Sequence, residues 1–128
     1  MDSLYDAIGG AAAFHDLVDR FYAGVAMDPI LRPLYPDEDL TEARHRLAGF
    51  LIQYWGGPTT YSDERGHPRL RMRHAQWVIG ERERDAWLGH MRAALDAVDA
   101  AGLDDDARAA IWEHLERAAW SLVNAPTR

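Results

Sequence analysis

The sequence predicts an all-α protein, and three observations lead to that prediction. Apolar residues recur at helical spacing in each of the longer periodic stretches of the chain. No stretch alternates apolar and polar residues as a half-buried strand does. Glycine and proline residues stand between the periodic stretches and separate them. A chain of 128 residues can bury a core and one cofactor pocket, so we expect a single domain over residues 1–128.

The composition is that of an ordinary globular protein, with 48% hydrophobic and 27% charged residues. The absence of cysteine rules out disulfides and thiolate metal sites and favours a reducing, cytoplasmic location. Residues 1–10 lack the features of a signal peptide, and no apolar stretch is long enough to span a bilayer. The net charge of −7 argues against nucleic-acid and membrane partners.

The first long helix is predicted between residues 14 and 25, after a short helix that ends at the glycine pair 9–10. Asp28-Pro29 opens a brief helical turn, which closes at Tyr35-Pro36 because the residue before a proline avoids helical geometry. The apolar face of the long helix consists of Phe14, Leu17, Val18, Phe21, Tyr22 and Val25.

A second helix is predicted to start near Asp39 or Thr41 and to end at the segment 56–58. The following residues, 56–69, show no periodicity and contain two prolines. We therefore expect a long ordered loop there, and loops of that length in compact domains usually have a functional reason. The apolar stripe of the second helix consists of Ala43, Leu47, Phe50, Leu51 and Tyr54.

Two more helices are predicted in the last third of the chain. The first follows Gly80 and is expected to end at Gly102, and Asp104 or Asp105 can cap the start of the second. The stripe of the first is Trp87, Leu88, Met91, Ala94, Leu95 and Val98, and that of the second is Ile111, Leu115, Ala118, Ala119 and Leu122.

The six histidines do not form a recognisable zinc site, since no two stand four residues apart and no HExxH motif occurs. We expect His15, His45, His90 and His114 to be surface or half-buried helical residues. His74 differs, because it follows the aperiodic stretch and has apolar neighbours on both sides. The residues alone make it a candidate metal ligand but favour an ordinary role.

Three polar aromatic residues bring hydrogen-bond donors toward the interior: Tyr22, Tyr35 and Trp87. Buried donors need partners, and ordinary packing with a backbone carbonyl as partner is the simpler interpretation for each. A second polar feature is the cluster of arginines at 65, 69, 71 and 73, beside two histidines. This cluster is either a solvated loop or a site for a carboxylate or phosphate, which arginine binds in bidentate fashion.

Taken together, several segments resemble the truncated haemoglobins, in particular their second group. They are LYDAIGG at 4–10, RFYAGVA at 20–26, LRPLYPDEDL at 31–40, YWGGPTTYSDERGHPRLRMRHA at 54–75, ERDAWL at 83–88 and SLVN at 121–124. The resemblance implies a two-over-two helical sandwich in which an extended loop precedes the proximal histidine. That loop would account for the aperiodic stretch at 56–69.

The resemblance also implies a site. His74 falls on the proximal position and would bind iron through Nε2, while Tyr22, Tyr35 and Trp87 fall on the distal side. Ala43 takes the position at which many globins carry a distal histidine. The resemblance further implies an apolar pocket lining and a contact with the haem propionates, for which Tyr61, His67, Arg69 and Arg73 are alternatives. The expected lining consists of Leu47, Phe50, Leu51 and Met72.

The implied function is a haem b globin that binds O₂, CO or NO at an iron with one histidine ligand and an open position. Up to three donors around the ligand would retain O₂ tightly, which suits nitric oxide dioxygenation or peroxide turnover with a separate reductase. A haem-based gas sensor acting through a separate partner is the alternative, and a cofactor-free helical interaction module is a third reading. The sequence leaves a homodimer open.

Overall fold

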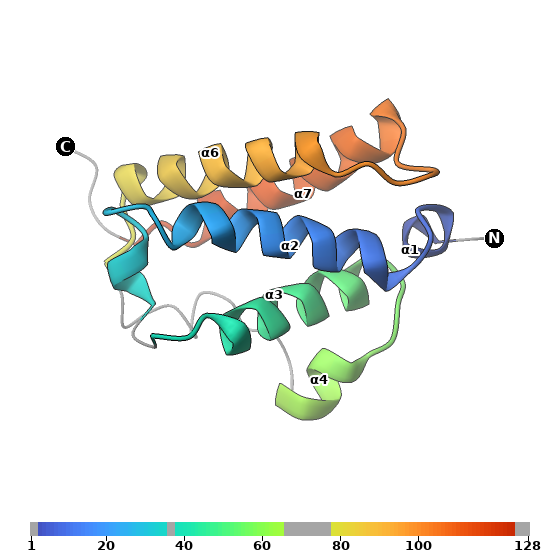
Figure 1. Ribbon diagram of the computed structural model, residues 1–128, viewed down its shortest axis with the longest axis horizontal. Helices are drawn as coiled ribbons and strands as arrows, with labels where there is room; N and C mark the ends of the chain where they lie inside the picture. The colour runs from blue at the N-terminus through green and yellow to red at the C-terminus, as the bar shows by residue number, and fades with distance from the viewer. Residues whose placement is uncertain (1–2, 36–37, 66–77, 125–128) are drawn as a thin grey trace.

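The computed structural model describes residues 3–35, 38–65 and 78–124. Within those ranges all regular elements are helical, which confirms the predicted class (Figure 1). The elements are α1 (Leu4–Ala7), α2 (Ala11–Val25), the 3₁₀ helix η1 (Arg32–Leu34), α3 (Thr41–Tyr54), α4 (Thr60–Arg65), α6 (Glu81–Ala97) and α7 (Asp105–Ser121).

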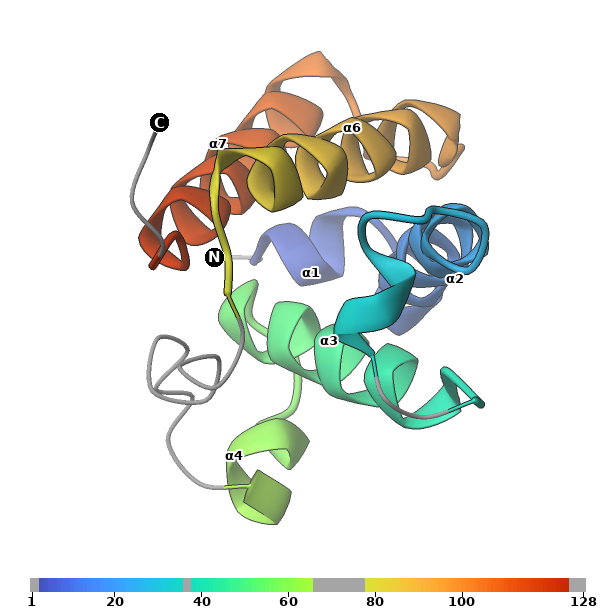
Figure 2. The ribbon, with the colours of Figure 1, turned by 90° about the vertical axis from the view of Figure 1, so that its left-hand side faces the viewer.

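The four long helices form two pairs. α2 packs against both α3 and α6, and α7 packs against α6. Figures 1 and 2 show the α6–α7 pair lying over the α2–α3 pair, with α4 beyond α3. None of the helices in the described part of the chain is long and apolar enough to cross a membrane.

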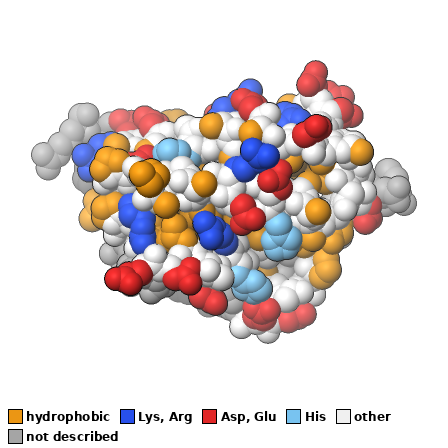
Figure 3. Space-filling view, in the orientation of Figure 1, with side chains coloured by type: hydrophobic (Ala, Val, Ile, Leu, Met, Phe, Trp, Pro, Cys, Tyr) orange, Lys and Arg blue, Asp and Glu red, His pale blue; other side chains and the backbone are white. Residues whose placement is uncertain are grey.

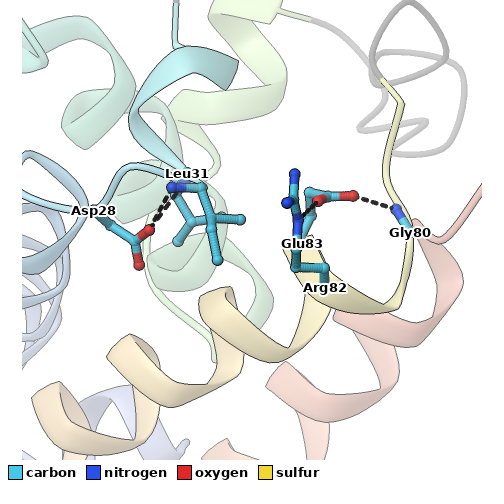
Figure 4. Close-up of polar contacts among 6 residues, drawn as sticks. Asp28, Leu31, Gly80, Arg82 and Glu83 are labelled. Carbon is cyan, nitrogen blue, oxygen red and sulfur yellow. Dashed lines mark hydrogen bonds and ion pairs between the residues drawn. The ribbon is translucent and has the colours of Figure 1, made fainter.

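Local capping explains where several helices begin. The Ser3 hydroxyl accepts a hydrogen bond from the Asp6 N–H at 3.2 Å at the start of α1, and Asp104 Oδ1 accepts one from the Ala107 N–H at 2.8 Å at the start of α7. Before α6, Glu83 folds back and accepts the Gly80 N–H at 2.9 Å (Figure 4). Of the two residues expected as candidates for the cap of α7, Asp104 and Asp105, Asp104 has that role, and the helix begins at Asp105.

The expected end of α6 at Gly102 is wrong, because the helix ends at Ala97. The Arg108 guanidinium on α7 donates to the carbonyls of Leu95 and Val98, which satisfies acceptors at the end of α6. Gly102 instead has a φ of +86° and lies against the Ala7 carbonyl, where a Cβ would overlap the backbone.

The predicted loop at 56–69 contains a helix, α4, and the part of the loop from residue 66 onward lies outside the described residues. Contacts with α3 explain this difference. The Gln53 side chain donates to the Ser62 hydroxyl at 2.7 Å and accepts the Ser62 N–H at 2.9 Å. Tyr61 is buried, with its ring 5.7 Å from that of Phe50. A periodicity search misses so short a helix, because tertiary contacts hold it.

The end of α3 also differs from the prediction. Tyr54, expected in the apolar stripe, is 50% exposed, whereas Ala48 and Ile52 are buried. His114 of α7, expected to be a surface or half-buried residue, is only 6% exposed. Its ring stacks on that of Tyr54 at a centroid distance of 3.6 Å, so Tyr54 covers a buried histidine instead of entering the core.

Exposed ion pairs contribute little to this packing. Acidic and basic groups are interspersed on the face shown in Figure 3. Typical pairs are Arg20–Asp16 at 3.0 Å and Arg92–Asp96 at 3.3 Å, each one helical turn apart and substantially exposed. Such pairs are worth roughly 0.3–0.5 kcal/mol. The fold therefore depends on its apolar contacts.

Burial of His114 predicts a specific dependence of stability on pH. Burial lowers the pKa of His114 from 6.5 to about 4. Between these values the unfolded chain binds a proton that the folded chain does not. The stabilisation is complete above pH 6.5, and we expect a loss of roughly 2 kcal/mol between pH 6.5 and pH 5. His114→Phe should remove this loss, as measured by urea unfolding at both pH values.

Replacement of the exposed His15 by Gln is the matched control and should keep the wild-type dependence. Other titrating groups are common to all three proteins and cancel in the comparison. Parallel pH profiles for the wild type and His114→Phe would contradict the prediction.

Candidate functional site

The structure brings together the three polar aromatic residues singled out in the sequence. Tyr22 comes from α2, Tyr35 follows η1 and Trp87 comes from α6. The Tyr22 and Tyr35 rings meet edge to face, with centroids 5.5 Å apart and an interplanar angle of 84°. Phe21 contacts both Tyr22 and Trp87, at centroid distances of 4.9 and 5.2 Å. One cluster therefore joins three segments that are distant in sequence.

The polar atoms of this trio are hydrogen-bonded to one another. Hydrogen bonding with Tyr35 is one of the causes that raise the pKa of Tyr22, and hydrogen bonding with Tyr22 and with the Trp87 indole N–H lowers the pKa of Tyr35. The trio carries three donor protons, and these two hydrogen bonds use two of them. One hydroxyl proton of the tyrosine pair is left over, and it can be donated to another acceptor at this place.

Both tyrosines are neutral donors. Burial, the largest cause, raises the pKa of Tyr22 and of Tyr35 above the usual 10.0. For Tyr22 the neighbouring Tyr35 raises the pKa further. The site therefore keeps its hydroxyl protons at any physiological pH.

The positive charge of a further residue, to which the sequence did not point, acts on the tyrosine pair. Arg46 of α3 lowers the pKa of both Tyr22 and Tyr35, although burial outweighs it. Its position three residues after Ala43, on the same side of the predicted helix, is the signal that could have found it. Arg46 can attract an anionic group at this edge.

The expected apolar lining on α3 divides into two kinds of residue. Ala43 and Leu51 are buried in the core. Leu47 and Phe50 pack against the core but stay only partly buried, as does Trp87 on α6. A flat apolar group with an anionic edge fits this set of residues. Its apolar part would contact the large, partly buried side chains, and its anionic edge would be attracted by the arginine. The described residues therefore fit a haem.

Tyr61, a candidate for the propionate contact, lies in a second aromatic cluster near the end of α3. This cluster contains two buried polar atoms for which the described structure shows no hydrogen-bond partner, Trp55 Nε1 and His114 Nδ1. Phe50 connects it to the apolar lining, since its ring lies 5.7 Å from Tyr61 and 6.1 Å from His114. Tyr61 is 7% exposed, so its side chain packs in the protein interior.

The expected iron ligand and several other candidates lie outside the described residues: His67, Arg69, Met72, Arg73 and His74. Within the described ranges no group of three or more His, Cys, Asp or Glu side chains could hold a metal ion. The roles of the five candidates outside the described residues therefore stay predictions.

Comparison with known proteins gives a consistent result. The family model described as bacterial-like globin matches residues 3–123. Group 2 truncated hemoglobin YjbI of Bacillus subtilis is 43% identical over 120 residues, which cover 94% of this chain and 87% of that protein.

Two solved structures agree closely with the fold. A thermostable hemoglobin from the actinobacterium Thermobifida fusca has a TM-score of 0.93 at 53% identity, covering 98% of this chain and all of the other. A truncated oxygen-avid haemoglobin from Bacillus subtilis has a TM-score of 0.87 at 42% identity, covering 96% of this chain and all of the other.

The buried tyrosine pair predicts a reduced ultraviolet titration. Because the pKa values of Tyr22 and Tyr35 are raised, neither should ionise near pH 10 while the protein is folded. Absorbance at about 295 nm should therefore have the same amplitude at that pH in Tyr22→Phe, in Tyr35→Phe and in the wild type. Free tyrosine amide calibrates the amplitude per residue, and circular dichroism checks the fold. A loss of one tyrosine's amplitude in either variant would show that this hydroxyl is not buried as described.

Proposed function

The chain belongs to the bacterial-like globin family, among its group 2 truncated haemoglobins, and we propose that it binds O₂ and other diatomic ligands at a haem b held by His74. Membership in the family supports a haem globin that takes small gas ligands. The assignment of His74 is supported by its place in the segment that resembles the family's proximal region. Haem supplies an open coordination position at which a diatomic ligand binds.

The residues of the chain would hold this group in two ways. Leu47 and Phe50 of α3, with Trp87 of α6, would cover its apolar faces, and Met72 is proposed to add to them. For the anionic edge, the Arg46 guanidinium is favoured by its charge, which acts on both tyrosines of the pair. Tyr61, His67, Arg69 and Arg73 stay candidates for that edge.

The observation that supports tight ligand retention is the leftover hydroxyl proton of the trio. Donors aimed at developing negative charge stabilise a ligand, and bound O₂ is more negative than bound CO. Up to three donors were expected, and hydrogen bonding within the trio would leave one of them for the ligand, with the other two orienting it. One hydrogen bond to a charged group contributes roughly 1.5–3 kcal/mol, which slows ligand loss about tenfold or more. A relative from Bacillus subtilis, 42% identical, is described as oxygen-avid.

Retention of O₂ suits redox chemistry on the ligand better than delivery. Nitric oxide dioxygenation and peroxide turnover are the proposed reactions. The small, buried Ala43 cannot donate a hydrogen bond to the ligand, because its side chain is a methyl group. The trio is therefore the proposed donor. A redox cycle needs an electron source, and a separate reductase is the proposed partner.

The assignment of the iron ligand is tested by His74→Leu. This change removes the imidazole while keeping an apolar side chain of similar size, so haem should be lost or bound without its proximal bond. Haem content and the ferrous carbonyl spectrum are the measurements. His15→Leu, which removes an exposed imidazole of α2, is the matched control and should load haem normally. A normal haem content and an unchanged ferrous carbonyl spectrum in His74→Leu would contradict the assignment.

The proposed donor is tested by ligand dissociation in Tyr22→Phe, Tyr35→Phe, Trp87→Phe and the double tyrosine variant. Loss of the leftover proton should speed O₂ dissociation about tenfold or more, with far less effect on CO, because donors act on the more negative ligand. Tyr35→Phe removes the shared acceptor and should therefore cause the largest increase in the rate of O₂ dissociation. In the double tyrosine variant, the increase should differ from the sum of the two single effects on the activation free energy. Equal acceleration of both ligands would mean that the substitutions only opened the pocket.

A further inference from the structure

A carboxylate outside the trio shapes the turn that leads to Tyr35. Asp28 lies between α2 and η1, and its Oδ1 accepts the Ile30 N–H at 2.7 Å. The same oxygen accepts the Leu31 N–H at 3.3 Å (Figure 4). Its backbone carbonyl accepts the Arg32 N–H at 2.9 Å. The hydrogen bonds continue toward the site, since Tyr35 N–H donates to the Arg32 carbonyl at 3.1 Å. Asp28 therefore sets the start of the segment that carries Tyr35.

The other oxygen of the same carboxylate binds α6. His90 Nε2 lies 2.6 Å from Asp28 Oδ2, and only 31% and 13% of the two side chains are exposed. A neutral or a charged imidazole can donate from Nε2, so this hydrogen bond does not need a charged histidine. The hydrogen bond from His90 is also the largest cause that lowers the pKa of Asp28 below its usual 3.8.

The imidazole is seated against the backbone of α2. A Cβ at Gly24 would overlap Nδ1 of His90, so only glycine leaves room for the ring here. Gly24 stands two residues after Tyr22 on α2. The His90 ring thus lies where α2, the turn before η1 and α6 meet. α2 and α6 carry Tyr22 and Trp87, and the turn leads through η1 to Tyr35.

We propose that Asp28 and His90 are positioning residues for the trio. Together they set how far the Trp87 indole lies from the Tyr35 hydroxyl. Trp87 and His90 are three residues apart on α6 and share a side of that helix. A shift of α6 relative to the turn therefore moves the Trp87 donor relative to its acceptor, and hydrogen bonds weaken steeply with distance and angle. This inference rests on the proposed function for its effect on ligands.

The test compares His90→Leu with His90→Gln in the haem-loaded protein. Leucine removes the donor to Asp28, whereas the glutamine amide can still donate. We expect about tenfold faster O₂ dissociation in His90→Leu, little change for CO, and a C–O stretch moved to higher frequency by the weaker positive field at the ligand. His90→Gln should stay close to the wild type. His15→Leu, an exposed histidine on α2, is the control for losing an imidazole.

Two further measurements separate positioning from general damage. Gly24→Ala, which displaces the ring without removing it, should reproduce the effect of His90→Leu. The indole N–H resonance of Trp87 in ¹⁵N-labelled carbonyl protein should move in His90→Leu and not in His90→Gln or His15→Leu. Because this resonance reports the hydrogen bond to Tyr35, it tests the inference without any ligand kinetics.

The outcomes distinguish this inference from the proposed function. Faster O₂ loss in Tyr35→Phe, with unchanged kinetics, C–O stretch and indole resonance in His90→Leu, would overturn the positioning role and leave the proposed function intact. A moved indole resonance in His90→Leu, without ligand effects in either tyrosine variant, would support positioning and reject the donor role. Equal changes in His90→Leu and His90→Gln would also overturn the inference, since the retained donor would have no effect.

Discussion

The packing of α2 against two helices at once is the constraint on which the rest of the structure depends. Its 15 residues bury a broad apolar face that contacts both α3 and α6. Phe14, Phe21 and Val25 are almost completely inaccessible to solvent. An isolated helix of this length is marginal in water, so these contacts supply most of its stability. Because α2 contacts α3 within its own pair and α6 of the other pair, its position decides where both helices present their side chains.

The same face of α2 explains why a polar site forms inside an apolar core. Tyr22 is 4% exposed, and a hydroxyl buried there has to find a partner within the protein. Tyr35 supplies that partner from another segment, and Trp87 adds its indole N–H. Burial also keeps both hydroxyls protonated. The cost of burying polar groups is thus offset by a network whose unused proton is available for a ligand.

Local patterns in the sequence determined most of the helices. Apolar spacing predicted α2, α3, α6 and α7, since a helix repeats its faces every 3.6 residues whatever lies around it. Asp104 marked the start of α7 because a cap acts on the next turn of its own chain. The resemblance to a known family then selected Tyr22, Tyr35 and Trp87, which the structure brings together, and His74, which lies outside the described residues. Composition and spacing alone could not have ranked these residues above ordinary core positions.

The sequence by itself therefore determined the helical class, the main helices and the identity of the polar trio. Only the tertiary structure decided the short helix α4, the burial of His114, the place of Arg46 and the Asp28–His90 hydrogen bond, whose partners are 62 residues apart. The physical reason is the same for each. A helical stripe or a cap depends on residues within a few positions, whereas these features depend on contacts between distant segments that exist only after the helices have packed.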